Sequence, residues 1–335
     1  MTRLIAVASL VLTLTGCDSS PPGSLAGSEP PTAAAPTMPS SPTAQPTAVG
    51  SPTVAAPATS PPAPTPTENP GVTLLAVGDV ASCDVTADES VARLVGQHEG
   101  VVALLGDVAY EHGTTANFTN CFDPAWGEFR ERLYPTPGNH EYGTPGAAGY
   151  FEYFGARAAG PGGWYSYDLG DYWRVIVLNA NCVEVGGCTR ESEQGTWLAQ
   201  TLRDASGRHI LAYWHHARFS TGPHGPNDNV AGFWDQVYEA QAAVVLSAHD
   251  HIYERFAPQT PWGAPATNGI RQFTVGTGGR GLYDYGSAPQ PTTEIRSNDT
   301  FGVLELTLRR TEYSWRFIPA EGTFTDSGSQ PLPPP

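Results

Sequence analysis

The chain has 335 residues and carries 17 basic against 33 acidic side chains, which gives a formal net charge of −16 at neutral pH. A surface that binds nucleic acid needs basic patches, so this charge argues against a nucleic-acid partner. An anionic substrate would need a local source of attraction in such a protein, and bound metal ions are the simplest one.

The first residues have the layout of a bacterial secretion signal. Arg3 supplies a positive charge, residues 4–14 form an apolar run, and two small residues stand directly before Cys17. This ending resembles a lipobox, in which the cysteine becomes the lipidated N-terminus; the alternative is an ordinary cleaved signal peptide with a chance cysteine. The run is much shorter than the ~20 residues that a membrane-spanning helix needs. We expect residues 1–17 to be a lipoprotein signal peptide and the protein to lie outside the bacterial cell, either anchored to the membrane only through Cys17 or secreted.

The rest of the chain divides by composition. Residues 18–70 consist almost entirely of Pro, Ser, Thr, Ala and Gly, which cannot bury a core and predict a disordered linker. Residues 71–320 are long enough for one large folded domain. Residues 321–335 are expected to be a flexible C-terminal tail.

Four further cysteines lie in the predicted domain: Cys83, Cys121, Cys182 and Cys188. An even number in an exported domain favours two disulfides, and we predict Cys83 with Cys121 and Cys182 with Cys188. The alternative is that the four cysteines bind zinc. The absence of a Cys-x-x-Cys motif in the sequence and the oxidising environment that export implies both argue against it.

Continuously apolar segments recur along the domain, and each ends in polar residues. They span residues 72–77, 101–105, 208–214 and 242–247. Helices are predicted between the first two segments and over residues 191–203, whose apolar side chains share one face. This alternation predicts an α/β sheet covered on both faces, in which ligands gather at the carboxyl ends of the strands. Residues 304–308 and 313–317 alternate and predict a closing hairpin.

Five polar clusters follow these strands or lie between them: Gly78-Asp79, Gly106-Asp107 with Tyr110, Gly138-Asn139-His140-Glu141, His215, and His249-Asp250-His251. A single Gly-Asp or Asn-His pair is usually only a turn, but the five together predict a site. Carboxylates with imidazoles suit Zn, Mn or Fe, and two such ions a few ångströms apart can hold a phosphate and lower the pKa of a water between them. Two aspartates with several histidines exceed what one ion needs. The glycines before Asp79, Asp107 and Asn139 are expected to allow sharp turns.

In this order, the motifs Gly-Asp, Gly-Asp-x-x-Tyr, Gly-Asn-His-Glu, His-x-x-x-Phe and His-x-His-x-Tyr-Glu-Arg resemble those of the calcineurin-like metallophosphoesterase superfamily. Tyr110 and residues 252–255 are similar to its purple acid phosphatase branch. The resemblance implies an α/β fold in which two mixed sheets form a β-sandwich flanked by helices, with the metal site at the C-terminal ends of the strands. It also implies two divalent or trivalent ions, Fe with Zn, Mn or Fe, and the hydrolysis of small phosphate monoesters.

The resemblance implies a role for each matching position. Asp107 would bridge both ions. The other ligands would be Asp79, Tyr110 and His251 in the first site, and Asn139, His215 and His249 in the second. His140 would be catalytic, protonating the leaving alkoxide or steadying the phosphoryl group. His216 would be a neighbour of the site and not a ligand.

Two further residues are candidates for substrate contact. His224 matches a substrate-facing, catalytic histidine in some relatives; the alternative is an ordinary loop histidine. Arg280 lies in the glycine-rich run 276–281, which lacks the Lys-Ser/Thr ending of a nucleotide-binding loop. We expect this run to be a turn near the site, with Arg280 contacting the substrate.

The sequence departs from the family pattern at three small residues, Ala81, Ala217 and Ala248, where the family usually has Gly, Pro and Gly. These departures weaken the inference that one metal is Fe(III). If Tyr110 ligates Fe(III), the protein should be purple; if Tyr110 is only a packed aromatic, colourless Zn or Mn sites are expected.

Three activities remain open at this stage. Monoester hydrolysis is favoured, because the purple branch mostly handles monoesters, and a phosphodiesterase of the same fold is the alternative. A non-catalytic surface binding module would be expected to lack ligands, whereas all seven expected positions are filled. The oligomeric state is not determined by these patterns.

Overall fold

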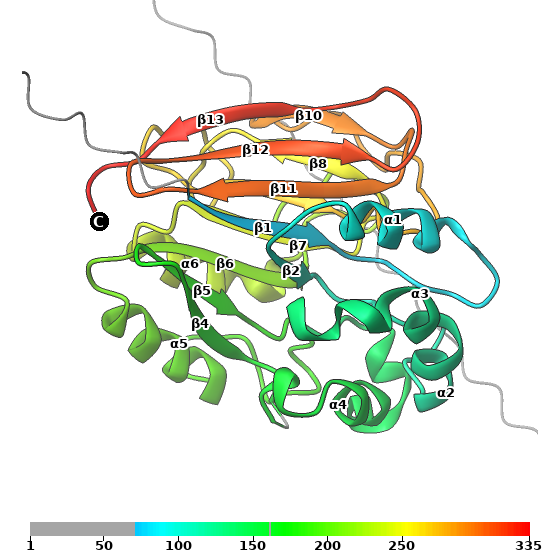
Figure 1. Cartoon of the computed structure of the whole chain (residues 1–335). Helices are drawn as coiled ribbons and strands as arrows, with labels where there is room; N and C mark the ends of the chain where they lie inside the picture. Colours follow the sequence, from blue (N-terminus) through cyan, green and yellow to red (C-terminus); the bar gives the residue numbers. More distant parts are fainter. Residues whose placement is uncertain (1–70, 161) are drawn as a thin grey trace, which may run out of the picture. The chain divides into compact units, whose positions relative to one another are not determined.

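A computed structural model describes residues 71–160 and 162–335 (Figure 1). The predicted signal peptide 1–17, the lipidation site Cys17 and the linker 18–70 lie outside the described residues. Within the described part of the chain, no helix combines the length and the apolar character needed to cross a membrane.

The described residues form two mixed β-sheets. The six-stranded sheet runs in the order β13 (Ser327–Pro331), β12 (Glu312–Pro319), β11 (Gly302–Leu308), β1 (Val72–Val77), β2 (Val101–Leu104) and β3 (Leu133–Pro135). The seven-stranded sheet runs in the order β10 (Thr293–Ser297), β8 (Tyr253–Phe256), β9 (Arg271–Val275), β7 (Val244–Ala248), β6 (His209–His216), β5 (Trp173–Val177) and β4 (Tyr165–Leu169). The central strands β1–β2–β3 and β5–β6–β7–β9 are parallel, and the outer pairs are antiparallel.

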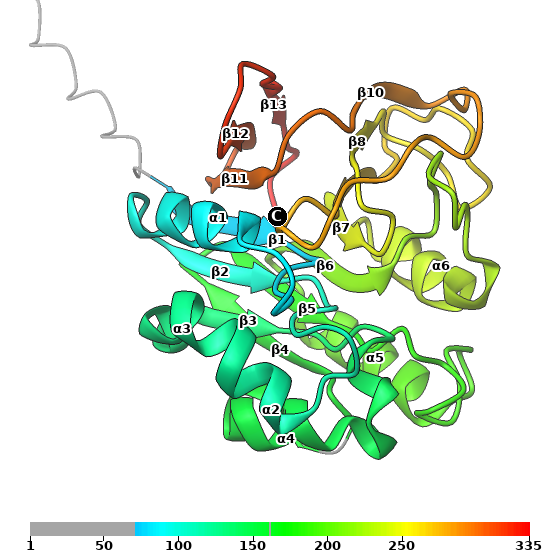
Figure 2. The same cartoon turned by 90° about the vertical axis from the view of Figure 1, so that its right-hand side faces the viewer.

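Helices cover the outer face of each sheet. They are α1 (Ala87–Gly96), α2 (Thr115–Asn117) with the π-helical turn Phe118–Phe122, α3 (Asp123–Trp126), α4 (Ala148–Phe154), α5 (Glu193–Asp204) and α6 (Ala231–Glu239). Figure 2 shows α1 and α3 on one side of the molecule and α6 on the other. The predicted fold class, a two-sheet sandwich flanked by helices, is confirmed.

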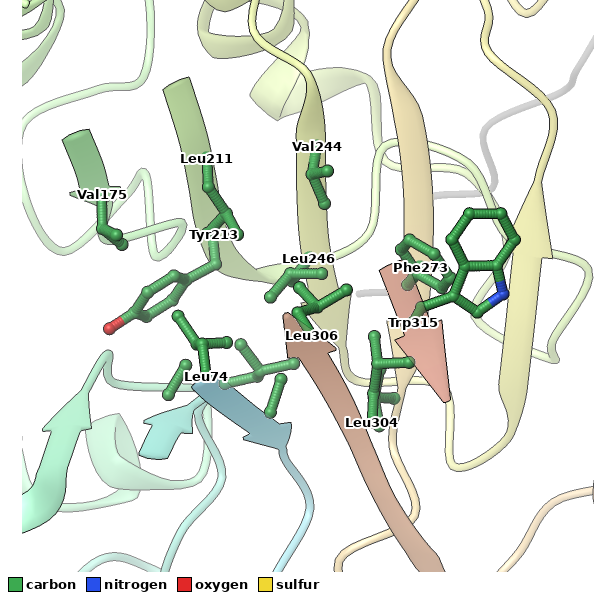
Figure 3. Packing of buried hydrophobic residues seen from close by; sticks show 14 of the residues in the cluster. Leu74, Val175, Leu211, Tyr213, Val244, Leu246, Phe273, Leu304, Leu306 and Trp315 are labelled. Carbon is green, nitrogen blue, oxygen red and sulfur yellow. The ribbon is translucent and has the colours of Figure 1, made fainter. Parts of the chain in front are cut away.

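The period of two along a strand explains the continuously apolar segments. On β1, Leu74 and Ala76 face the core between the two sheets, whereas Leu75 and Val77 pack against the helices on the outer face. Figure 3 shows Leu74 among residues of both sheets in the central core. The last four side chains of β1 are therefore all buried, alternately on one face of the sheet and on the other.

The last residues of the chain are not a flexible tail, and this prediction was wrong. Residues 327–331 form the edge strand β13, which pairs with β12 over its whole length. The Asp326 carboxylate also accepts hydrogen bonds from Tyr253 Oη at 2.8 Å and Arg255 Nε at 2.7 Å. The strand is polar and largely exposed, so it shows no apolar alternation. It is held by backbone hydrogen bonds and by this buried carboxylate instead.

Two disulfides are present, Cys83–Cys121 and Cys182–Cys188, in the pairing that the sequence predicted. The first joins the segment after β1 to the helical region that covers the six-stranded sheet, across 38 residues of sequence. The second closes a local loop with a separation of 6 residues.

We expect the two disulfides to differ in their contribution to stability, because a longer closed loop restricts the unfolded chain more. Replacing Cys83 and Cys121 by Ser should lower the free energy of unfolding by about 4 kcal/mol, and replacing Cys182 and Cys188 by about 2 kcal/mol. Denaturant unfolding of the oxidised double variants measures both values. The reverse order would contradict the loop-length argument.

Candidate metal centre

The polar clusters of the sequence meet where the C-terminal ends of both sheets come together. The six-stranded sheet contributes Asp79 after β1, Asp107 after β2 and Asn139 after β3. The seven-stranded sheet contributes His215 within the end of β6, and His249 and His251 after β7. One sheet thus supplies oxygen ligands and the other supplies imidazoles.

Asp107 lies between two groups of candidate ligands. Its Oδ2 is 3.1 Å from His215 Nε2 and 3.3 Å from Tyr110 Oη. On one side, Tyr110 Oη lies 2.9 Å from Asp79 Oδ1 and 3.1 Å from His251 Nε2. Asp79, Tyr110 and His251 therefore form one group beside Asp107, which we call the first ligand group.

On the other side, His215 Nε2 lies 3.2 Å from Asn139 Oδ1 and 3.2 Å from His249 Nδ1. These three residues form the second ligand group. One ligand atom from each of Asp107, His215 and His249 can be chosen so that all three lie within 4.8 Å of one another. A carboxylate oxygen with two imidazole nitrogens at this spacing fits a first-row transition metal. The arrangement brings together all seven residues to which the resemblance assigns a metal.

The backbone is strained at three of these positions. Outside glycine, six described residues have positive φ, and three of them are candidate ligands: Asp79 at 59°, Asp107 at 48° and His249 at 74°. Such conformations are uncommon for residues with side chains, and they cluster at functional sites. At each of these three ligands, the positive φ changes the direction of the chain shortly after the strand ends.

One of the three glycines has the role expected of it: Gly106 adopts a φ of 90° at the turn before Asp107. Gly106 and Gly138 also make room for the ligand side chains. A Cβ atom at Gly138 would stand 2.1 Å from Asp107 Oδ1, and one at Gly106 would stand 2.7 Å from His215 Nδ1. Glycine is required at both places because the backbone passes against a ligand side chain.

Backbone carbonyls determine which nitrogen of each histidine is available. His215 Nδ1 lies 2.8 Å from the Leu105 carbonyl, and His251 Nδ1 lies 3.0 Å from the Gly281 carbonyl. A carbonyl oxygen can only accept, so both Nδ1 atoms carry hydrogen, and Nε2 faces the aspartates. Outer contacts of this kind orient metal-ligating histidines. His140 is held in the same way by the Glu111 carbonyl at 2.7 Å.

Glu141 ties the ligand turns together. Its buried carboxylate accepts hydrogen bonds from four backbone N–H groups, those of Asp107, Val108, Ala109 and Gly138, at 2.7–3.2 Å. The turn after β2 and the turn after β3 therefore share one acceptor. The motif Gly-Asn-His-Glu drew attention to this residue, but its function as an anchor is visible only in three dimensions.

We predict that Glu141→Gln lowers the free energy of unfolding of the metal-free protein by about 2–4 kcal/mol, because an amide NH₂ would face backbone N–H groups and leave them unsatisfied. Denaturant unfolding in the presence of a chelator measures this. Glu131→Gln is the matched control, since its carboxylate is 87 % exposed and its loss should cost less than about 0.5 kcal/mol. Equal effects would contradict an anchoring role.

The buried charges of the site shift one another's pKa values. Burial disfavours the charged form of His215, but the Asp107 carboxylate raises its pKa to about 9. Burial likewise opposes ionisation of Asp107, yet the contact with His215 holds its pKa below the ordinary value. Burial and the two aspartates raise the pKa of Tyr110 well above its usual range. In the metal-free protein at neutral pH, a proton therefore lies on His215 where a cation would bind.

Metal affinity should consequently depend on pH. A pKa of about 9 means that His215 is protonated below that pH, and an incoming ion must displace the proton. We expect the apparent affinity for Zn²⁺ to rise at least about tenfold per unit between pH 6 and pH 8. Competition titrations against a chromophoric chelator measure the slope. A histidine with an ordinary pKa would give a slope that flattens above about pH 6.5, which would contradict the pairing with Asp107.

The remaining predicted residues lie around the ligands. His224 is exposed, with its ring centroid 4.2 Å from that of His249. Arg280 pairs with the Glu111 carboxylate, and its guanidinium stands 5.1 Å from the centre of the Tyr110 ring. The ring centroids of His216 and His249 are 4.4 Å apart. The Nδ1 atom of His216 has no hydrogen-bond partner among the described residues. This position fits a neighbour of the site.

The sequence named Asp250 without giving it a role, and it did not single out Tyr283. Asp250 belongs to the His249-Asp250-His251 cluster, yet its carboxylate turns away and accepts from Ser220 Oγ at 2.5 Å and from the backbone N–H of His224 at 2.9 Å. Tyr283 stacks on His251, with ring centroids 3.9 Å apart and planes 9° apart. Asp250 could have been found from its place between two ligands, whereas Tyr283 follows no motif.

Comparison with known proteins now identifies the family. Residues 72–253 match the model of the calcineurin-like phosphoesterases. The chain belongs to this family. Members of this metallophosphoesterase family use divalent metals, and the predicted superfamily is confirmed. No curated protein matches the chain.

Solved structures share the fold of this family member. The purple acid phosphatase PPD1 from yellow lupin seeds matches with a TM-score of 0.67 at 15% identity, over 77% of this chain and 53% of that one. GAP50, described as the anchor in the inner membrane complex of Plasmodium, matches at 0.59 with 13% identity, over 77% and 88%. A dimetal phosphatase from Danio rerio matches at 0.51 with 12% identity, over 77% and 99%. The matched region spans about half the length of the lupin protein. At these identities the likeness shows the fold alone.

Proposed function

We propose that this family member is a binuclear-metal phosphatase that hydrolyses small phosphate monoesters. The observation that carries the proposal is the position of Asp107 between two complete ligand groups, one with Asp79, Tyr110 and His251 and one with Asn139, His215 and His249. When bound, two metal ions would polarise the phosphate and activate water for attack on phosphorus. The complete ligand set favours catalysis over a non-catalytic binding module.

The side chains around the ligands fit the departure of an alcohol. His140 Nε2 lies 4.0 Å from Asp107 Oδ2, and its side chain is 31 % exposed, so it can reach a bound ester. Its Nδ1–H is held by the Glu111 carbonyl, so in the imidazolium the second proton is on Nε2, facing the site. From there His140 can protonate the leaving alkoxide as a general acid. His224 stands beside His249 and is exposed, so it can contact the phosphoryl group next to the second ligand group.

The proposed identity of the metals rests on Tyr110. Its hydroxyl is buried between Asp79, Asp107 and His251, which favours a ligand over a packed aromatic. We therefore propose Fe(III) in the first ligand group and Fe, Zn or Mn in the second. Visible absorption of the purified protein, lost on Tyr110→Phe, distinguishes this pair from two colourless ions. The proposed location is outside the cell, with the lipid on Cys17 as the only membrane contact.

We predict that His140→Ala in the full chain lowers kcat on p-nitrophenyl phosphate by about 10²–10⁴-fold while both metals still bind. Asp107→Asn should lower activity further and also reduce metal content, because both ligand groups lose their shared oxygen. His98→Ala is the control, since His98 lies before β2, at the opposite end of the strands, and pairs with Glu305.

The choice of substrate class is tested with the same protein. A monoesterase should hydrolyse p-nitrophenyl phosphate faster than bis(p-nitrophenyl) phosphate at every pH, and the reverse order would favour a phosphodiesterase. A folded protein that takes up no metal and hydrolyses neither ester would overturn the proposed function.

A further inference from the structure

The segment after β9 wraps around the first ligand group. The backbone N–H of Gly278 donates to the Gly78 carbonyl at 2.9 Å, and that of Arg280 donates to the Asp79 carbonyl at 3.1 Å. A Cβ atom at Gly276 would stand 2.7 Å from Asp79 Oδ2. The glycine-rich run that resembles a phosphate-binding loop therefore lies with its backbone against a ligand. We call residues 276–283 the ligand-wrapping loop.

The end of this loop contacts His251 in three ways. The Gly281 carbonyl accepts from His251 Nδ1 at 3.0 Å, and the backbone N–H of Tyr283 donates to the His251 carbonyl at 3.0 Å. The Tyr283 ring lies parallel to the imidazole, 3.9 Å away between centroids. The carbonyl contact fixes the proton on Nδ1, and the stacked ring limits rotation of the imidazole plane.

These contacts direct His251 Nε2 toward the other members of its group. Nε2 is 3.1 Å from Tyr110 Oη and 3.4 Å from Asp79 Oδ1. A rotation about the Cβ–Cγ bond would move Nε2 out of this position. The Tyr283 ring lies against the face of the imidazole and so opposes that rotation.

We propose that Tyr283 is a positioning residue of the metal centre, whose ring holds the His251 imidazole in the plane that presents Nε2 to the first ligand group. This role rests on the proposed two-metal function. Tyr283 does not stack on a member of the second ligand group; His249 is covered instead by His224, whose ring centroid is 5.8 Å from that of Tyr283. Loss of the Tyr283 ring should therefore weaken one of the two metal sites and leave the other.

The experiment compares Tyr283→Leu with Tyr283→Phe in the full chain. Zn²⁺ is titrated into the metal-free proteins against a chromophoric chelator, and kcat and KM are measured with p-nitrophenyl phosphate. Tyr283→Leu should weaken one Zn²⁺ site by about 10–100-fold, as expected when an outer contact of a ligand is lost, and leave the second site unchanged. Tyr283→Phe keeps the ring and should restore the affinity to within about threefold of wild type. At limiting Zn²⁺ the leucine variant should lose kcat with little change in KM.

Tyr285→Leu is the matched control. Tyr285 is an aromatic residue just beyond the same loop, and its ring packs under Arg296 at 4.0 Å. Its loss should leave both Zn²⁺ affinities and kcat unchanged. A comparable loss of Zn²⁺ affinity in Tyr285→Leu would mean that removing any nearby aromatic ring disturbs the metal centre. That result would overturn the specific role of Tyr283.

The remaining outcomes separate this inference from the proposed function. A wild-type chain that binds two ions and hydrolyses the ester, together with normal Zn²⁺ affinities in Tyr283→Leu, would overturn the positioning role alone. A folded wild-type chain that binds neither Zn²⁺ nor Fe and does not hydrolyse the ester would overturn the proposed function and this role with it. If Tyr283→Leu does not fold, Tyr283→Met, which also removes the ring, replaces it in the same titration. Loss of affinity at one Zn²⁺ site supports the role, and normal affinity at both sites overturns it.

Discussion

The Glu141 carboxylate is the contact on which the rest of the site depends. It is buried, no cationic side chain among residues 71–160 and 162–335 hydrogen-bonds to it, and it accepts instead from four backbone N–H groups at the ends of two neighbouring strands. A buried carboxylate is stable only when its oxygens are satisfied in this way. Because the donors belong to the turns that carry Asp107 and Asn139, satisfying this one charge also places ligands for both groups.

The site also joins the two layers of the sandwich. Asp79, Asp107 and Asn139 extend from the six-stranded sheet, whereas His215, His249 and His251 extend from the seven-stranded sheet. In the central core, side chains of the two sheets pack against one another (Figure 3). Ions bound between the two sets would link the sheets at the same edge. The packing of the two sheets against each other therefore also determines how the two sets of ligands face each other.

The charge of the chain limits how the site could attract a phosphate. The net charge is −16, and Arg280, which lies beside the ligands, is already paired with Glu111. Attraction for an anion would then come mainly from the bound ions and from histidines such as His140 and His224. The arginine therefore lies at the predicted place, but its charge is largely compensated by a residue that the sequence did not associate with it.

The sequence by itself was sufficient for the residue types of the site, their order and their position at strand ends, and it predicted the two disulfides and the fold class. Apolar runs, glycine turns and short motifs can be recognised within a few residues, and the two-sheet fold class followed from the family resemblance that these motifs carry. The tertiary structure decided the rest. It showed that β13 is an edge strand, that Gly106 and Gly138 lie against ligand side chains, that three of the ligands themselves adopt positive φ, and that Tyr283 covers His251. A polar edge strand has no apolar period, and a stacked ring 32 residues from its partner has no motif. Both depend on contacts between distant segments, which only the folded chain brings together.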